Sequence, residues 1–188
     1  MSLMEQKAKE LEERRAHLRL GGGQEKIEAQ HAKGKLTARE RIDRLLDPGT
    51  FVEIGLFAKH RCTQFGLDRM ELPADGVVTG HGKIAGRTVF VYSQDFTVMG
   101  GSCGPVHQKK MAYTAAMAYE AKAPLIGLYD SAGARLQEGS ENITFARLFY
   151  QNARCSGVIP QIAAIMGPSA GGSVYSPALM DFIIMVKK

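Results

Sequence analysis

The pattern of apolar and polar positions divides this chain into a helical N-terminal arm and a core in which strands and helices alternate. Apolar residues recur at helical spacing from about residue 4 to residue 19, where a run of three glycines ends the pattern. A second helix is expected at 24–33. A third begins at Thr37, which has the spacing of a capping box with Glu40, and it ends at the 47–49 turn. We therefore predict a helical arm over residues 1–50.

From residue 51 onward the pattern is that of an α/β layered fold. Two strands, at 76–84 and 87–92, form a hairpin that turns at Ala85–Gly86. The other expected strands are 51–54, 125–129, 161–166 and 182–186, and the expected helices are 106–121, 141–153 and a short one from Ser173. Buried strands that alternate with helices favour largely parallel pairing, in which the loops at the carboxyl ends of strands carry the site.

Composition is that of a soluble globular protein, with 188 residues, 45% hydrophobic and 23% charged. Because no apolar run approaches the roughly 20 residues that span a bilayer, and because the first residues lack a signal-peptide core, we expect a cytoplasmic protein with no membrane insertion. Cys62, Cys103 and Cys155 have no paired spacing, so neither a metal site nor a disulfide framework is expected.

The net charge of +5 does not indicate a nucleic-acid partner. The first 47 residues hold 11 Lys and Arg against 9 Asp and Glu, and the two signs are interleaved as on a solvated helix face. No aromatic residues interleave with these charges for base stacking, so nucleic-acid binding is not predicted.

Three glycine-rich loops, at 93–104, 130–139 and 167–173, are the candidate sites of chemistry. The first lacks the G-x-G-x-x-G spacing, so it does not support a nicotinamide cofactor. In the second, Asp130 and Arg135 could serve in acid–base chemistry, but we expect ion pairs that hold the loop.

The third loop has two interpretations. The spacing Gly167-x-Ser169-x-Gly171 matches a nucleophile elbow, which would make Ser169 the nucleophile of a serine hydrolase. However, no histidine follows Ser169, so a triad would need another order with His81 or His107. In the other interpretation, backbone amides of two neighbouring loops form an oxyanion hole for a thioester enolate.

Four motifs in these loops and before them carry a resemblance to a known family. They are 73–80 (PADGVVTG), 93–102 (SQDFTVMGGS), 130–139 (DSAGARLQEG) and 171–182 (GGSVYSPALMDF). In this order they resemble the carboxyltransferase β subunit of biotin-dependent acyl-CoA carboxylases, of the propionyl-CoA carboxylase β-chain and methylmalonyl-CoA transcarboxylase type. The arm fits as well, through its glycine run and the segment 34–41 (GKLTARER), so the resemblance covers nearly the whole chain.

The resemblance implies a crotonase-like fold, a superhelix of repeated strand–strand–helix turns. The family has two such domains in one chain, and residues 51–188 resemble an incomplete N-terminal domain. It implies an acyl-CoA substrate and biotin as the cofactor, on a carrier protein that works with a biotin carboxylase subunit. It also implies a homo-hexamer, and a location in the cytoplasm or, in a eukaryote, the mitochondrial matrix.

The resemblance also implies roles for the glycine-rich loops. The oxyanion hole would use the amide of Ala134, with Gly133 beside it, and the amide of Gly172, with Gly171 beside it. Carboxybiotin would release carbon dioxide and its ureido nitrogen would take the substrate α-proton, so no protein base is needed and Ser169 becomes a turn residue. The substrate contacts implied by the motifs are Gly100, Gly101, Ser102 and Ala132.

Alternatives remain open beside this interpretation. A biotin-dependent decarboxylase coupled to sodium export would use the same chemistry in reverse, and a non-catalytic CoA-binding fragment would keep the loops without turnover. The sequence chooses neither the direction of the reaction nor the acyl chain. We expect the chain alone to be inactive, because the resemblance assigns part of the site to a second domain.

Overall fold

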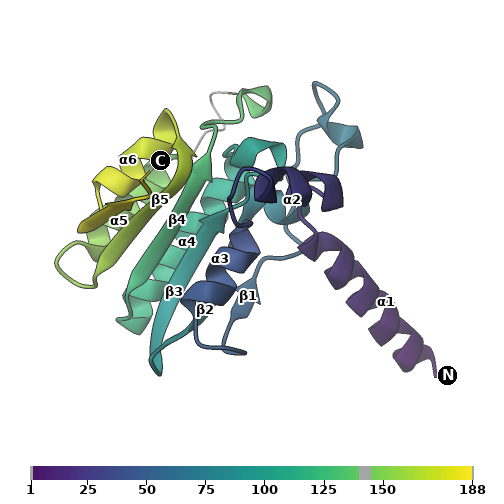
Figure 1. Cartoon of the computed structure of the whole chain (residues 1–188), viewed down its shortest axis with the longest axis horizontal. Coiled ribbons are helices and arrows are strands. Elements are labelled where there is room, and N and C mark those ends of the chain that lie inside the picture. The colour runs from purple at the N-terminus through teal and green to yellow at the C-terminus, as the bar shows by residue number, and fades with distance from the viewer. Residues whose placement is uncertain (1, 140–144, 188) are drawn as a thin grey trace.

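The arm consists of three helices, α1 (Leu3–Arg19), α2 (Gln24–His31) and α3 (Ala38–Leu45). The computed structural model describes residues 2–139 and 145–187. Helix α1 extends away from the rest of the molecule, whereas α3 lies against the sheet (Figure 1). The predicted capping box is confirmed, because the Thr37 hydroxyl accepts from the Glu40 N–H and the Glu40 carboxylate accepts from the Thr37 N–H.

The core is built on one six-stranded sheet with the strands in chain order. Its strands are β1 (Val52–Ile54), β2 (Val77–Ile84), β3 (Arg87–Gln94), β4 (Leu125–Ser131), β5 (Gln161–Ser169) and β6 (Phe182–Met185). Strands β1, β2 and β3 pair antiparallel, and β3 to β6 pair parallel. The expectation of largely parallel strands therefore describes only the second half of the sheet. The short Ala85–Gly86 turn forces β2 and β3 to run in opposite directions.

Longer connections join the parallel strands. Helix α4 (Pro105–Ala121) follows β3, α5 (Phe145–Cys155) follows β4, and α6 (Gly172–Ala178) follows β5. The first residues of the helix predicted at 141–153 lie outside the described residues. Among the helices that the structure describes, none has the length and apolar character required to cross a membrane.

One boundary differs from its prediction in a way that matters for the site. Strand β5 continues to Ser169 instead of ending at Met166, so Gly167 and Ser169 belong to the strand and not to the turn. The extension exists because Ser169 pairs with Ser131 of β4 across a local shift in register. The turn is therefore confined to Ala170 and Gly171, directly before α6.

Each face of the sheet has its own apolar core, because successive side chains of a strand point to opposite faces. Helices α4 and α5 cover one face and α3 covers the other (Figure 1). Phe90 and Tyr92 of β3 contribute to the first core, whereas Val89 and Val91 contribute to the second, together with Ile42 of α3. The arm is thus part of the packing of the sheet.

Strand β6 forms an edge of the sheet with exposed apolar side chains. In the described chain Phe182, Ile183, Ile184 and Met185 are 61%, 52%, 59% and 70% exposed. Contiguous apolar surface of this kind is typical of an interaction surface.

We predict that Ile42→Ala lowers the free energy of unfolding by about 2–5 kcal/mol, the cost of a cavity in a packed core. Ile42 is fully buried against the sheet, so the loss would show that α3 folds together with it. Urea denaturation of the chain measures the change. Leu11→Ala in α1 is the control, because Leu11 is 41% exposed and its truncation should cost less than about 0.5 kcal/mol. Equal losses in the two variants would contradict the prediction.

Candidate functional site

The three glycine-rich loops meet at the carboxyl ends of β3, β4 and β5, because these strands are parallel neighbours in the sheet. Each loop contributes one residue to a buried cluster, which consists of Cys103, Ser131 and Ser173. The Cys103 Sγ atom lies 3.6 Å from Ser131 Oγ and 3.3 Å from Ser173 Oγ, and the two serine oxygens are 3.3 Å apart. Burial raises the pKa of the Cys103 thiol, so this cluster is a packing contact between uncharged groups. No local sequence pattern marks this cluster.

Backbone hydrogen bonds join the first loop to the second. The Ala132 N–H donates to the Gly100 carbonyl at 2.9 Å, and the Cys103 N–H donates to the Gly133 carbonyl at 2.8 Å. The Arg135 N–H donates in turn to the Cys103 carbonyl at 3.0 Å. The two loops therefore run side by side like a short pair of strands.

The remaining residues predicted to contact substrate lie in the same place. Gly100 and Gly101 lie in a short 3₁₀ turn (Met99–Gly101) that follows β3. Ser102 is buried and accepts from Arg135 twice, at its hydroxyl (3.2 Å) and at its carbonyl (2.7 Å). The structure thus brings together Gly100, Gly101, Ser102 and Ala132 at the junction of two loops.

The second and third loops touch at Gly133. A Cβ atom built on Gly133 would lie 3.0 Å from the carbonyl oxygen of Ala170, and its φ of +102° is rarely adopted by other residues. A side chain at position 133 would therefore both strain the backbone and push the third loop away. The contact brings the segments that carry Ala134 and Gly172 next to each other.

Two backbone N–H groups of the site, those of Ala134 and Gly172, have no acceptor among the described residues, 2–139 and 145–187. Both residues are half-buried, and Gly171 next to Gly172 is exposed. N–H groups on adjacent loops can both donate to one ligand oxygen.

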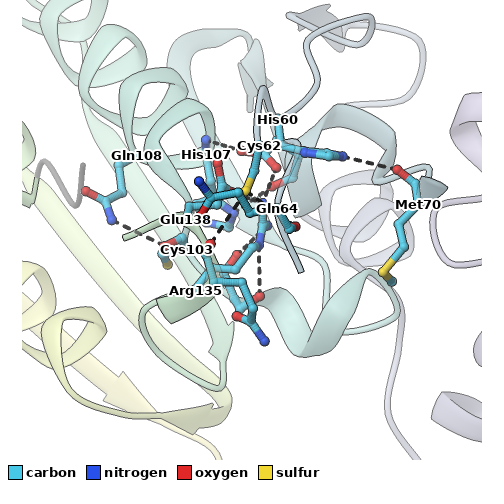
Figure 2. Close-up of polar contacts among 12 residues, drawn as sticks. His60, Cys62, Gln64, Met70, Cys103, His107, Gln108, Arg135 and Glu138 are labelled. Carbon is cyan, nitrogen blue, oxygen red and sulfur yellow. Dashed lines mark hydrogen bonds and ion pairs between the residues drawn. The ribbon is translucent and has the colours of Figure 1, made fainter. Parts of the chain in front are cut away.

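Arg135 is held in a buried ion-pair network (Figure 2). Its Nη1 atom lies 2.5 Å from Asp75 Oδ1 and 2.7 Å from Glu138 Oε1. The other oxygen of Asp75 accepts from the His107 N–H at 2.6 Å, at the start of α4. Asp75 was not predicted from the sequence to be a functional residue. Its position in the motif at 73–80 is the signal that could have identified it.

Asp130 forms a separate buried cluster with the arm. Its carboxylate lies 2.8 Å from Lys35 Nζ and 2.7 Å from Arg41 Nη2, and it accepts from the Gln30 amide at 3.3 Å. The expectation of loop-holding ion pairs is confirmed for both Asp130 and Arg135, which use different partners.

Ser169 lacks the surroundings of a nucleophile. Its hydroxyl donates to the Ser173 carbonyl at 3.1 Å. His107 hydrogen-bonds with the Asp75 carbonyl and with Gln94, and burial, with Arg135 nearby, lowers the pKa of His107 to about 3. His81 packs against Phe90 on the hairpin. In the described part of the chain, neither histidine is a base for Ser169.

No metal centre accompanies the loops in the described ranges. Within 2–139 and 145–187 there is no group of three or more His, Cys, Asp or Glu side chains that could hold a metal ion. A cavity of about 680 Å³ lies beside the second loop, between the segment 61–65 and the start of α4. Its wall includes Glu138, the partner of Arg135.

Known proteins similar to this chain are named for one kind of chemistry, the transfer or removal of a carboxyl group on an acyl-CoA. The propionyl-CoA carboxylase β chain of Roseobacter denitrificans is 56% identical over 179 residues, which are 95% of this chain and 35% of the relative. The methylmalonyl-CoA decarboxylase subunit α of Propionigenium modestum is 52% identical over 187 residues, or 99% of this chain and 36% of the relative. The crystal structure of the transcarboxylase 12S hexamer with methylmalonyl-CoA bound superimposes with a TM-score of 0.95 at 52% identity, covering 98% of this chain and 36% of that one.

These matches confirm the crotonase-like fold and identify the family. The chain spans about a third of the length of the relatives it matches. The sequence pattern of the carboxyl transferase domain matches residues 29–188, which include all three loops of the site. The chain therefore belongs to the carboxyl transferase domain family.

Proposed function

We propose that this chain forms the acyl-CoA side of a biotin-dependent carboxyltransferase, which moves a carboxyl group between biotin and a short-chain acyl-CoA. One observation carries the proposal: on two loops that touch, the N–H groups of Ala134 and Gly172 have no acceptor in the part of the chain that the structure describes. The names of two relatives support the substrate class: the propionyl-CoA carboxylase β chain described above, and the methylmalonyl-CoA carboxyltransferase 12S subunit of Propionibacterium freudenreichii, which is 52% identical over 188 residues.

In this mechanism the thioester carbonyl oxygen accepts from both amides. Removal of the α-proton turns this oxygen into an enolate oxygen, and fixed donors favour that charge because they need no reorganisation when it forms. Gly133 (φ +102°) and Gly171 (φ +54°) provide the positive-φ backbone that the two loops need beside these amides. The substrate contacts assigned to the neighbouring turn are Gly100, Gly101, Ser102 and Ala132.

The proton acceptor in this proposal is supplied by the cofactor. When bound, carboxybiotin on a carrier protein would supply carbon dioxide and a ureido nitrogen able to accept the α-proton. The surroundings support this division of labour, because Asp130 and Arg135 are committed to ion pairs and His107 is buried and neutral. The described loops therefore bind and orient the thioester.

The partners follow from the same proposal. Residues 51–188 act as a partial N-terminal domain and residues 1–50 as its arm, in a homo-hexamer that works with a biotin carboxyl carrier protein and a biotin carboxylase subunit. The 12S transcarboxylase is a hexamer. The cytoplasm is the proposed location, or the mitochondrial matrix in a eukaryote. A relative from Homo sapiens, 56% identical over 180 residues, is named as a mitochondrial propionyl-CoA carboxylase β chain.

A second candidate is decarboxylation of a malonyl-type CoA with transfer to biotin. The identity of 52% to a methylmalonyl-CoA decarboxylase subunit favours it specifically. The same two amides would stabilise the enolate that forms when the carboxyl group leaves, so the direction depends on the partner subunits. Incubating a reconstituted complex with methylmalonyl-CoA, with and without ATP and bicarbonate, separates the two directions.

We predict that a chimera carrying this chain in place of the matched segment of the Roseobacter β chain transfers carboxyl groups to propionyl-CoA. Its kcat should lie within about tenfold of the parent, since the fold and loops are shared. The isolated 188-residue chain should show no turnover, and calorimetry with propionyl-CoA tests whether it binds substrate. A correctly assembled but inactive chimera would refute the proposal, and turnover by the isolated chain would refute the need for further sequence.

We predict that removing the Gly172 N–H in the chimera lowers kcat about 10²–10³-fold, the usual effect of losing one oxyanion donor. Gly172→Pro removes this donor at the first position of α6, where proline is tolerated. The Phe145 ring occupies the space of a Cβ at Gly172, so both this variant and its control, Gly172→Ala, are made with Phe145→Ala. Equal rates for the proline and alanine variants would exclude the amide as a donor.

We predict that Ser169→Ala in the chimera keeps kcat within about twofold of the unsubstituted chimera, because its hydroxyl serves the Ser173 carbonyl. A serine nucleophile would lose on the order of 10⁴-fold or more. Carboxyl transfer and ester hydrolysis are measured on the same preparations. Loss of both activities would favour the hydrolase interpretation over the amide mechanism.

A further inference from the structure

The arm reaches the candidate site through one buried carboxylate. Asp130 lies at the carboxyl end of β4, directly before the loop that carries Ala134. All its described side-chain donors come from the arm: Gln30 of α2, Arg41 of α3, and Lys35 between them. The Asp130 side chain is completely buried and that of Arg41 is nearly so.

Lys35 contacts all three strand ends of the site. Its Nζ atom lies 2.8 Å from Asp130 and 5.0 Å from the centre of the Phe96 ring in the first loop. On β5, a Cβ at Gly167 would overlap both the Lys35 ammonium and the Asp130 carboxylate. Glycine at position 167 therefore leaves room for the arm to enter between the strand ends.

A second contact fixes the arm to the first loop. The Gly22 N–H donates to Thr97 Oγ1 at 3.0 Å, and a Cβ at Gly22 would overlap the Thr97 carbonyl. Thr97 is held in turn by the carboxylate of Asp95, to which its N–H and its hydroxyl both donate. The glycine turn of the arm thus packs directly on the segment before Gly100.

The loop from Ser131 to Ala134 is consequently fixed at both ends. Asp130 at one end is held by the arm, and Arg135 at the other is held by Asp75. Charges buried this deeply are stable only when they are paired, so each end has one favoured position. A displacement of about 1 Å in a reacting geometry can cost as much as 10²-fold in rate.

We propose that Lys35 and Arg41 are positioning residues, which hold the Asp130 carboxylate and thereby fix the amide of Ala134 for the oxyanion. The catalytic part of this inference rests on the proposed function, whereas the claim that the arm holds the loop does not. Neither side chain touches substrate in this account, because both act through Asp130.

The first test is amide hydrogen exchange in the isolated chain. In Arg41→Gln, exchange should rise about tenfold at the hydrogen-bonded amides of Cys103, Ala132 and Arg135, because the loop opens more often. Arg39→Gln is the matched control, since Arg39 lies on the same helix and its ion pair with Glu53 does not reach the site. Equal increases in the two variants, or none, would overturn the proposal.

The second test is kinetic and uses the chimera. Arg41→Gln and Lys35→Met should each lower kcat about tenfold with the KM for propionyl-CoA changed less than about twofold, and Lys35→Arg should restore most of the rate. A selective rise in exchange without a fall in kcat would overturn the catalytic role of this positioning. An inactive unsubstituted chimera would refute the proposed function, and the exchange comparison would still decide whether the arm holds the loop.

Discussion

The structure depends on the pairing of two buried charges that flank a single loop. Asp130 and Arg135 are both removed from water, and an unpaired charge in such a place would cost several kcal/mol. Each must therefore recruit partners that lie far away in the chain: Arg41 for Asp130 and Asp75 for Arg135. The arm, the segment before β2 and the end of β4 consequently fold around one loop.

The segment before β2 is held in a strained backbone conformation in which Asp75 reaches Arg135. Ala74 and Asp75 both have φ of +52°, a conformation that side chains disfavour. The Lys110 ammonium donates to the Ala74 and Val77 carbonyls on either side, and burial lowers the pKa of Lys110 to about 7. The backbone around Asp75 is thus fixed by its own carboxylate and by Lys110. Strain of this kind persists only where the surroundings determine the backbone so fully.

Local patterns predicted the helices, the hairpin and the capping box of Thr37, because each is decided by residues close together in the chain. The extension of β5 to Ser169 was missed because its cause is a pairing with Ser131 of another strand. The candidate loops were found from their glycines and from a family resemblance. Their supports were not, since the Arg41–Asp130 pair spans 89 residues of sequence and no local pattern marks it.

The division of roles among the polar groups of the site is consistent with the proposal that backbone amides stabilise the reacting oxygen. Among the described residues near the loops, Asp130 and Arg135 are committed to ion pairs. His107 is neutral because burial lowers its pKa to about 3. The thiol of Cys103 is enclosed with its pKa raised. Where the side chains of a site serve to hold the loops in place, the backbone N–H groups of those loops are the groups that can bind a ligand. Backbone amides held this way are suited to stabilising a charge that forms on a substrate oxygen. The proposed mechanism accordingly leaves proton transfer to a group that arrives with the second substrate.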